Sequence, residues 1–203
     1  MDGLEVSAAA AGLRWCILFL AFSLVAGAAA AAEPHSLAGA ALLGALRSGG
    51  YVLYFRHMST DIGQKVAGYE NCASELNLTD AGRADAREIG AAIRSLGIPI
   101  GEILASPYCR ARETAELIFG RASVSPAVLG SPGPGGYAEL KLLFARRVPL
   151  GANLAIVSHR DPFAAAAGGP YLEEGEAAVI EPLGDAGFRV VARIRMDEWK
   201  ALQ

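Results

Sequence analysis

Four side chains suited to anion binding stand at or just beyond the ends of three apolar runs in the sequence. Arg56 and His57 follow the first run, Arg110 lies shortly after the second, and His159 ends the third. Guanidinium groups bind oxyanions through paired hydrogen bonds, and an imidazole can donate or accept a proton. A single Arg-His pair could equally be a core histidine beside a surface arginine, but three such runs together predict an anion site.

An alternation of helix and strand signals would bring these side chains together. The predicted helices span residues 36–49, 79–97 and 106–120, and the predicted strands span 52–55, 102–106, 153–159, 176–182 and 188–195. This alternation is typical of a mostly parallel sheet with helices on both faces. Ligands of such folds bind at the carboxyl edge of the sheet. We therefore expect an α/β fold, a three-layer α/β/α sandwich, with the site at that edge.

The start of the third predicted helix gives Arg110 a second reason to bind an anion. Ser106 is the expected N-cap and Pro107 the expected first helical residue, which places Arg110 in the first turn. The free N–H groups and positive dipole end of a helix favour anions there. The Pro/Gly-rich segment 125–136, in contrast, is expected to be a surface loop within the same domain.

The amino terminus differs in composition from the rest of the chain. Residues 15–32 carry no charge, follow Arg14 and end in alanines that offer small-residue cleavage sites. We predict that residues 1–32 form a cleaved secretory signal and that residues 33–203 form one domain. The protein would then be exported and periplasmic. Asp2 and Glu5 are unusual in such a leader, and the uncharged run reaches the lower limit for a membrane span, so an uncleaved membrane anchor is the alternative.

Composition and charge narrow the classes of partner. The 203 residues are 53% apolar and 19% charged, which suits a single folded domain. The net charge is −3, and the basic residues are scattered, so no nucleic-acid footprint is visible. A membrane contact is expected only if the leader is uncleaved. No cysteine-histidine cluster or carboxylate grouping in the sequence specifies a metal, and no cofactor is expected.

The three chemical motifs carry a family resemblance. The segments "FRHMST", "ASPYCRARETA" and "AIVSH" resemble, in the same order, the motifs of the histidine phosphatase superfamily, which is related to phosphoglycerate mutase. The resemblance extends over residues 50–199, and the closing segment "LEEGEAAVIEPLGDAGFRVVARIRMDEW" resembles exported bacterial members. It implies a phosphoglycerate mutase-like fold and a metal-independent phosphomonoester hydrolase.

The resemblance also implies roles for individual residues. His57 would be the nucleophile that forms a phosphohistidine, which water then hydrolyses. Arg56, Arg110 and His159 would surround the phosphoryl oxygens, and Thr60 would add a hydroxyl contact. The substrate would be a phosphorylated small molecule or a phosphorylated envelope component.

The general acid that protonates the leaving group has two candidates. One branch of the superfamily uses a glutamate between the second motif and the last histidine, and Glu139 lies in that interval. Glu139 could instead be a solvated side chain on an amphipathic helix. Another branch places an aspartate directly after the last histidine; here Arg160 stands in that place and Asp161 follows it, as the second choice.

Two departures from the family pattern leave other functions open. Met58 stands where a small residue is usual and is expected to make the pocket floor narrower or more apolar. Glu75-Leu76 replaces the Gln-Arg of related exported proteins, which removes a possible substrate-facing cation and leaves the substrate open. Met58 and the unsettled choice of acid make a non-catalytic phosphate-binding or scaffold protein the alternative. A phosphomutase is a third possibility. It is disfavoured, because export would separate the enzyme from its glycolytic substrate.

Two cysteines, Cys72 and Cys109, remain after the leader. An exported protein meets an oxidising compartment, so we expect them to form one disulfide that links the first motif's loop to the start of the second motif's helix. Two buried free thiols are the alternative, because free cysteine also packs as a small apolar residue.

Overall fold

The structure is a computed structural model that describes residue 1 and residues 36–63, 71–130 and 135–202. These residues, apart from Met1, belong to one compact unit, Pro34–Gln203. The predicted leader lies outside the described residues except for Met1, so its cleavage or anchoring stays a prediction. Within the described ranges, none of the helices has the length and hydropathy needed to cross a membrane.

The centre of this unit is one six-stranded sheet in the order β3-β2-β4-β1-β5-β6. The strands are β1 (Val52–Arg56), β2 (Ile100–Ala105), β3 (Ser123–Val124), β4 (Asn153–Ser158), β5 (Ala177–Pro182) and β6 (Phe188–Ile194). The first four run parallel to one another, while β5 pairs antiparallel with β1 and β6 antiparallel with β5. The prediction of a mostly parallel α/β sheet is confirmed.

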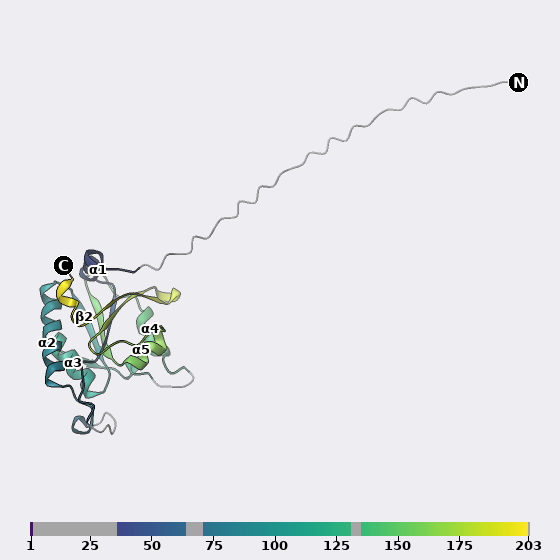
Figure 1. Cartoon of the computed structure of the whole chain (residues 1–203). Helices are drawn as coiled ribbons and strands as arrows, with labels where there is room; N and C mark the ends of the chain where they lie inside the picture. Colours follow the sequence, from purple (N-terminus) through teal and green to yellow (C-terminus); the bar gives the residue numbers. More distant parts are fainter. Residues whose placement is uncertain (2–35, 64–70, 131–134, 203) are drawn as a thin grey trace. The chain divides into compact units, whose positions relative to one another are not determined.

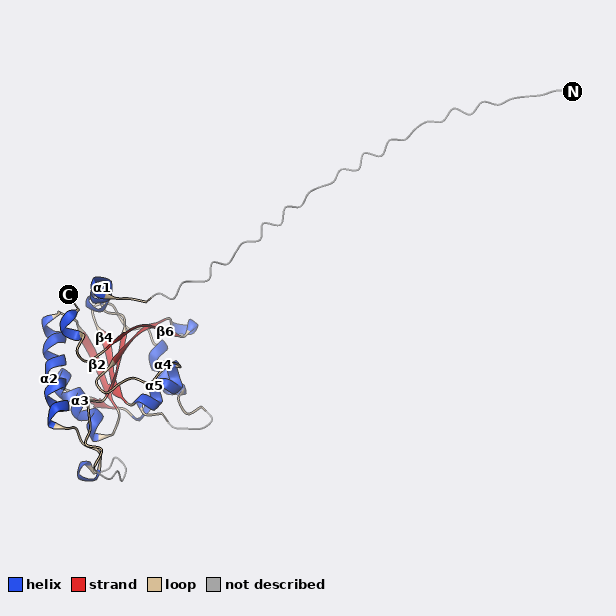
Figure 2. Ribbon diagram, in the orientation of Figure 1, coloured by secondary structure: helices blue, strands red, loops and turns tan. Residues whose placement is uncertain are grey.

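Helices cover both faces of this sheet (Figures 1 and 2). The helices are α1 (Gly39–Ser48), α2 (Asp80–Ser95), α3 (Cys109–Phe119), α4 (Ala138–Ala145) and α5 (Arg160–Ala167). In Figure 2, α2 and α3 lie on one side of the strands, and α4 and α5 lie on the opposite side. Helices α4 and α5 were not among the predicted helix ranges. The alanine run of α5 has no apolar periodicity to reveal it.

The central strands β1, β4 and β5 are buried on both faces, as the alternation of their side chains shows. On β1, Leu53 and Phe55 belong to the core cluster beneath α1, α2 and α3. Val52 and Tyr54 belong to the second cluster, which includes Phe144 of α4 and further side chains of α5. Successive residues of a strand point to opposite faces, so each central strand contributes to both layers of the core.

Sheet order places the ends of three strands side by side. Strand β4 lies between β1 and β2, with Arg56 opposite Ser158 and Ala105 opposite Val157. Because these strands are parallel, the residues that follow them leave the sheet at the same edge. His57, Ser106 and His159 are those next residues, so the topology itself gathers the predicted site.

Candidate active site

One cavity of about 630 Å³ lies at this carboxyl edge. Six predicted site residues line it: Arg56, His57, Thr60, Arg110, His159 and Asp161. The rest of the described lining is partly apolar and aromatic, and consists of Ile62, Leu76, Tyr108, Leu129, Gly130, Tyr137, Arg160, Pro162 and Glu174. Residues from the three sequence motifs thus meet in one place.

The ring of His57 is held in a single orientation by its neighbour's backbone. Its Nδ1 lies 2.8 Å from the carbonyl oxygen of Met58. A carbonyl oxygen only accepts hydrogen bonds, so Nδ1 carries the proton and Nε2 keeps its lone pair. Thr114 supports this arrangement, because its Oγ1 accepts the Met58 N–H at 3.1 Å. The imidazole therefore offers Nε2 as its nucleophilic atom.

Burial keeps His57 in the neutral form that a nucleophile requires. Its side chain is 7% exposed, and the resulting desolvation lowers its pKa to about 3, assisted by the nearby guanidinium groups of Arg110 and Arg56. The bond to Met58 acts in the opposite direction, since it favours the protonated ring. At neutral pH the free protein holds this histidine uncharged.

His159 lies against His57, with the two ring centroids 5.3 Å apart. Its Nε2 is 2.8 Å from Ser106 Oγ, and its Nδ1 is 3.4 Å from Nη2 of Arg110. Because arginine only donates, Nδ1 is the acceptor and Nε2 carries the proton toward Ser106. Burial, followed by the charge of Arg110, lowers the pKa of His159 to about 2. Both histidines are thus neutral in the absence of a bound anion.

Arg56 is anchored at the end of β1 by the segment that precedes β5. Its Nη1 donates to the carbonyl of Leu172 at 2.9 Å, and its Nη2 lies 3.3 Å from Oε1 of Glu174. The same carboxylate oxygen accepts a hydrogen bond from Thr60 Oγ1 at 3.4 Å. Glu174 lines the cavity and was not singled out in the sequence, where it lies among other acidic residues with no motif to mark it.

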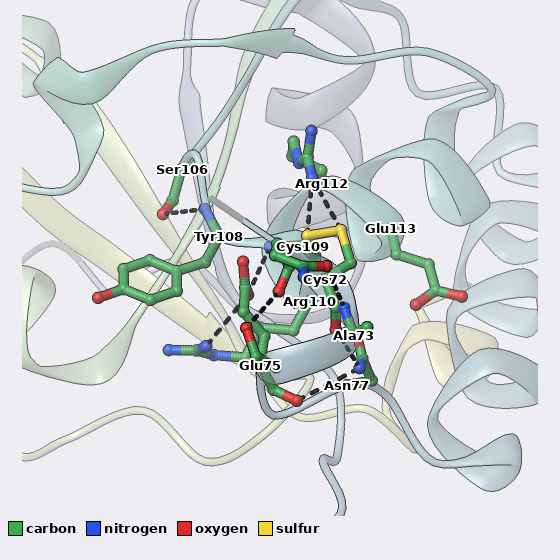
Figure 3. The surroundings of a disulfide bond; sticks show 12 residues. Cys72, Ala73, Glu75, Asn77, Ser106, Tyr108, Cys109, Arg110, Arg112 and Glu113 are labelled. Atoms are coloured by element: carbon green, nitrogen blue, oxygen red, sulfur yellow. Dashed lines mark hydrogen bonds and ion pairs between the residues drawn. A yellow bond between two sulfur atoms is a disulfide. The ribbon is translucent and has the colours of Figure 1, made fainter. Parts of the chain in front are cut away.

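Arg110 is anchored by a different carboxylate, which is buried behind it (Figure 3). Glu75 is fully buried, and its Oε2 lies 3.7 Å from Arg110 Nη1 while accepting the Cys109 N–H at 2.8 Å. The guanidinium also stacks over the Tyr108 ring, 4.4 Å from its centroid. The pKa of Arg110 is lowered, because the effect of burial exceeds the opposite effect of the negative charge on Glu75.

Several guanidinium nitrogens at the site remain unsatisfied. Within the described part of the chain, Nε of Arg56 and both Nε and Nη1 of Arg110 are buried without a hydrogen-bond partner. Buried donors are normally paired, and exceptions concentrate where a ligand or ion completes the network. This feature fits a site that receives an oxyanion.

The predicted cap of the second motif's helix is wrong. Helix α3 begins at Cys109 with Tyr108 as the N-cap, so Ser106 and Pro107 precede it. The Ser106 hydroxyl is instead drawn to His159, where the buried ring nitrogen offers a better partner than the helix end. Arg110 is the second residue of α3 and still lies in its first turn.

The structure gives the two departures from the family pattern different consequences. Met58 is fully buried in the core cluster and is absent from the cavity lining, so the expected narrowing of the pocket floor is wrong. Its side chain packs in the same core cluster as Leu53 and Phe55 of β1. Of the replaced pair, Leu76 lines the cavity, whereas Glu75 is the buried partner of Arg110.

The two candidate acids lie in different surroundings. Asp161 lines the cavity from the first turn of α5, immediately beyond His159. Glu139 is exposed in the first turn of α4 and is not part of the described lining. The geometry therefore places Asp161 nearer the chemistry than Glu139, and the role of each stays a prediction.

A disulfide joins Cys72 to Cys109, with their Cα atoms 5.6 Å apart (Figure 3). It links the 3-10 turn η1 (Cys72–Ser74) to the first residue of α3, one position before Arg110. Nη2 of Arg112 donates to both sulfurs. Among the described residues, these two cysteines and Glu75 are also the one grouping with metal-ligand spacing, but the disulfide occupies both sulfurs.

Comparisons with known proteins agree with this arrangement. Residues 53–129 match the family model of the histidine phosphatase superfamily (branch 1), a range that includes Arg56, His57 and Arg110 and ends before His159. A search of curated proteins found no match.

Solved structures share the fold at low sequence identity. A protein histidine phosphatase, SixA, complexed with tungstate is 18% identical, with a TM-score of 0.57 over 73% of this chain and 98% of that chain. A Thermus thermophilus protein is 21% identical, with a TM-score of 0.50 over 71% and 99%. An Entamoeba histolytica phosphoserine phosphatase mutant bound to phosphoserine is 14% identical, with a TM-score of 0.50 over 70% and 95%. Residues 53–129 of the chain are thus similar to the histidine phosphatase superfamily, and the described domain shares the fold of these solved structures.

Proposed function

We propose that the protein is an exported, metal-independent phosphomonoester hydrolase that acts through a phosphohistidine on His57. The observation that carries the proposal is the orientation of His57, whose Nδ1–H donates to the Met58 carbonyl, while Nε2 has no hydrogen-bond partner among the described residues; Arg56, Arg110 and His159 line the same cavity. A neutral imidazole with one nitrogen held and the other available is the form a nucleophile needs.

The reaction would proceed in two displacements. The Nε2 lone pair attacks phosphorus, an N–P bond forms, and the bond between phosphorus and the leaving oxygen breaks. Positive charge that develops on the ring is stabilised by the Nδ1–H bond to Met58. Water then attacks phosphorus and returns the N–P electron pair to Nε2, releasing inorganic phosphate. Arg56, Arg110 and His159 stabilise the charge on the phosphoryl oxygens in both steps.

Asp161 is the better-supported general acid of the two candidates, because it lines the cavity and Glu139 does not. Its carboxyl would donate a proton to the leaving oxygen and take one back from the attacking water. Asp161→Asn should therefore slow alkyl phosphates far more than p-nitrophenyl phosphate, whose leaving group needs little protonation. Glu139→Gln is the matched comparison, and equal slowing of both substrates by a variant would exclude that residue as the acid.

The choice of substrate rests on the superfamily and on the cavity. Structures with this fold include one complexed with tungstate, a tetrahedral oxyanion, and one bound to phosphoserine. The unsatisfied guanidinium nitrogens of Arg56 and Arg110 suit such an anion, and the aromatic rings of Tyr108 and Tyr137 line the space beside it. A small phosphomonoester, or a phosphate on an envelope component, fits these features.

Trapping of the phosphoenzyme tests the proposal. Acid quenching and base quenching during turnover of a labelled substrate in EDTA should show an acid-labile, base-stable phosphoenzyme on the wild-type protein. His57→Asn should show none, while retaining an amide that can donate to the Met58 carbonyl. Equal trapping on both proteins would overturn the assignment of His57. Absence of both trapping and phosphate release would favour the non-catalytic phosphate-binding alternative, although one argument for that alternative, a pocket altered by Met58, no longer holds.

A further inference from the structure

Glu174 contacts Arg56, which the proposed reaction assigns to phosphate, and Thr60, for which the family resemblance implies a phosphate contact. Its Oε1 atom lies 3.3 Å from Nη2 of Arg56 and 3.4 Å from Oγ1 of Thr60. One oxygen placed between a guanidinium and a hydroxyl has the surroundings expected of a phosphoryl oxygen in this site. The carboxylate therefore occupies a position that the substrate also needs.

The segment around Glu174 is braced, so this placement is built into the fold. The Leu172 carbonyl accepts from Arg56 Nη1, as described above. Two residues beyond Glu174, the carboxylate of Glu176 is nearly buried and receives Nε and Nη2 of Arg193 at 2.6 and 2.8 Å. Nη2 of Arg193 also donates to the carbonyl of Tyr171 at 2.8 Å. The backbone on both sides of Glu174 is thus tied down, directly in front of Arg56.

The Glu174 side chain, in contrast, is free to leave. It is 31% exposed and opens onto the cavity, whereas the Arg56 side chain is 15% exposed and fixed by Leu172. A phosphoryl dianion presents more charge and more acceptor oxygens to Arg56 than one carboxylate does. Displacing the carboxylate into solvent therefore leaves the arginine in place for the incoming phosphate.

We propose that Glu174 is a specificity-determining residue, a resident anion that every substrate phosphate must displace from Arg56 and Thr60. The inference rests on the proposed function, because both assign Arg56 to the substrate phosphate. When the site is empty, Glu174 pairs with the buried guanidinium of Arg56. Because phosphate must displace it, Glu174 raises the concentration of phosphate needed to fill the site.

Anion binding to the full protein tests this inference. Titration of inorganic phosphate in a calorimeter should give a dissociation constant about tenfold lower for Glu174→Gln than for wild type, as expected when one charge-assisted contact no longer competes. Glu173→Gln is the matched control, because it removes the same charge from an exposed neighbour whose backbone N–H donates to Glu176. That control should change the constant by less than twofold.

Two results would overturn the inference and leave the proposed function standing, and a third would overturn both. An unchanged or higher dissociation constant in Glu174→Gln would make Glu174 a support for Arg56 and not a competitor. An equal decrease in Glu173→Gln would assign the effect to general charge. No phosphate binding by wild type or by either variant would overturn both this inference and the proposed function.

Steady-state kinetics provide an independent readout. Glu174→Gln should lower KM for an alkyl phosphate and for p-nitrophenyl phosphate by the same factor, and the ratio of their kcat values should not change. Selective loss of kcat on the alkyl phosphate would identify Glu174 as the proton donor, which also contradicts the proposed competition.

Discussion

The two arginines of the site are each paired with a glutamate, but the pairs differ in where the carboxylate lies. Glu174 faces Arg56 from the cavity side and is 31% exposed, whereas Glu75 lies behind Arg110 and is fully buried. Glu75 also accepts the Cys109 N–H, and a disulfide fastens that same residue to the preceding loop. Among the described residues, the Glu174 carboxylate contacts the side chains of Arg56 and Thr60 and accepts no backbone N–H.

This difference teaches that the same ion pair can serve opposite purposes. A buried carboxylate behind a guanidinium keeps its partner aligned. It cannot exchange with a ligand, because separating the pair would leave an uncompensated buried charge. A carboxylate on the cavity side can move into water and be replaced. We therefore expect Arg110 to be rigidly preset and Arg56 to exchange its partner when an anion binds.

The disulfide should produce the largest effect, because it anchors the Arg110 side and has no counterpart at Arg56. Its two cysteines are 37 residues apart in the sequence. Closing a loop of that size contributes about 4 kcal/mol in the chain-entropy model. Cys72→Ser/Cys109→Ser should lose stability of that order in urea unfolding and bind inorganic phosphate more weakly through Arg110.

Mass spectrometry of the non-reduced, alkylated protein is the control for this prediction. A linked peptide containing Cys72 and Cys109 is expected from wild type. Complete alkylation of both thiols under denaturing conditions would show that the protein carries no such bond, and the stability difference would then need another cause.

Truncation of either arginine should come next in magnitude. Arg56→Ala and Arg110→Ala should each lower kcat by about 10², by analogy with the loss of one preorganised donor. Arg87→Ala, on the exposed face of α2, is the control and should retain activity. A loss of less than threefold in either site variant, measured with p-nitrophenyl phosphate, would place that arginine outside the reaction.

Neutralising the two glutamates should shift phosphate affinity in opposite directions. Glu75→Gln should weaken phosphate binding and lower kcat/KM by about tenfold, because Arg110 loses the charge that aligns it. Glu174→Gln should tighten binding. A thermal melt of both variants checks that each is folded. If both variants bound phosphate more tightly, or both more weakly, the distinction between the buried and the exposed pair would be wrong.

The histidines give the smallest but most direct comparison of the two arginines. Burial is the main cause of the lowered pKa of His57 and His159, and Arg110 lowers both more than Arg56 does. NMR titration should therefore show the pKa of His159 rising further in Arg110→Ala than in Arg56→Ala. The reverse order would mean that Arg56, and not Arg110, is the guanidinium that dominates the field at His159.

The same shifts set the acid stability of the protein. The unfolded chain protonates these histidines below about pH 6.5, whereas the folded protein resists protonation down to about pH 3 for His57 and about pH 2 for His159. Unfolded molecules bind more protons in this window, so stability is present above pH 6.5 and falls as the pH falls. Each histidine contributes a slope of up to about 1.4 kcal/mol per pH unit, and His159→Asn should remove one such slope in urea unfolding. An unchanged slope would contradict a neutral, buried His159.

Much of the fold followed from local patterns in the sequence. The apolar run before Arg56, the runs before Ser106 and before His159, and the intervening helices predicted a mostly parallel sheet, because period and turn chemistry act within short segments. The boundary at Ser106 was predicted wrongly, because the propensity of serine to cap a helix was overridden by a tertiary contact with His159. No local signal could reveal that contact.

The sequence by itself predicted Arg56, His57, Arg110 and His159 as one site, since they lie in motifs whose order is specific, and the fold brings these four residues to one cavity. Only the tertiary structure decided how they are poised. Three features depend on where strands and loops meet: the hydrogen bond from His57 to the Met58 carbonyl, the burial of Glu75 behind Arg110, and the exposure of Glu174 on the cavity side of Arg56. Two glutamates are chemically identical in a sequence, and the solvent around each decides whether it fixes an arginine or yields it to a substrate.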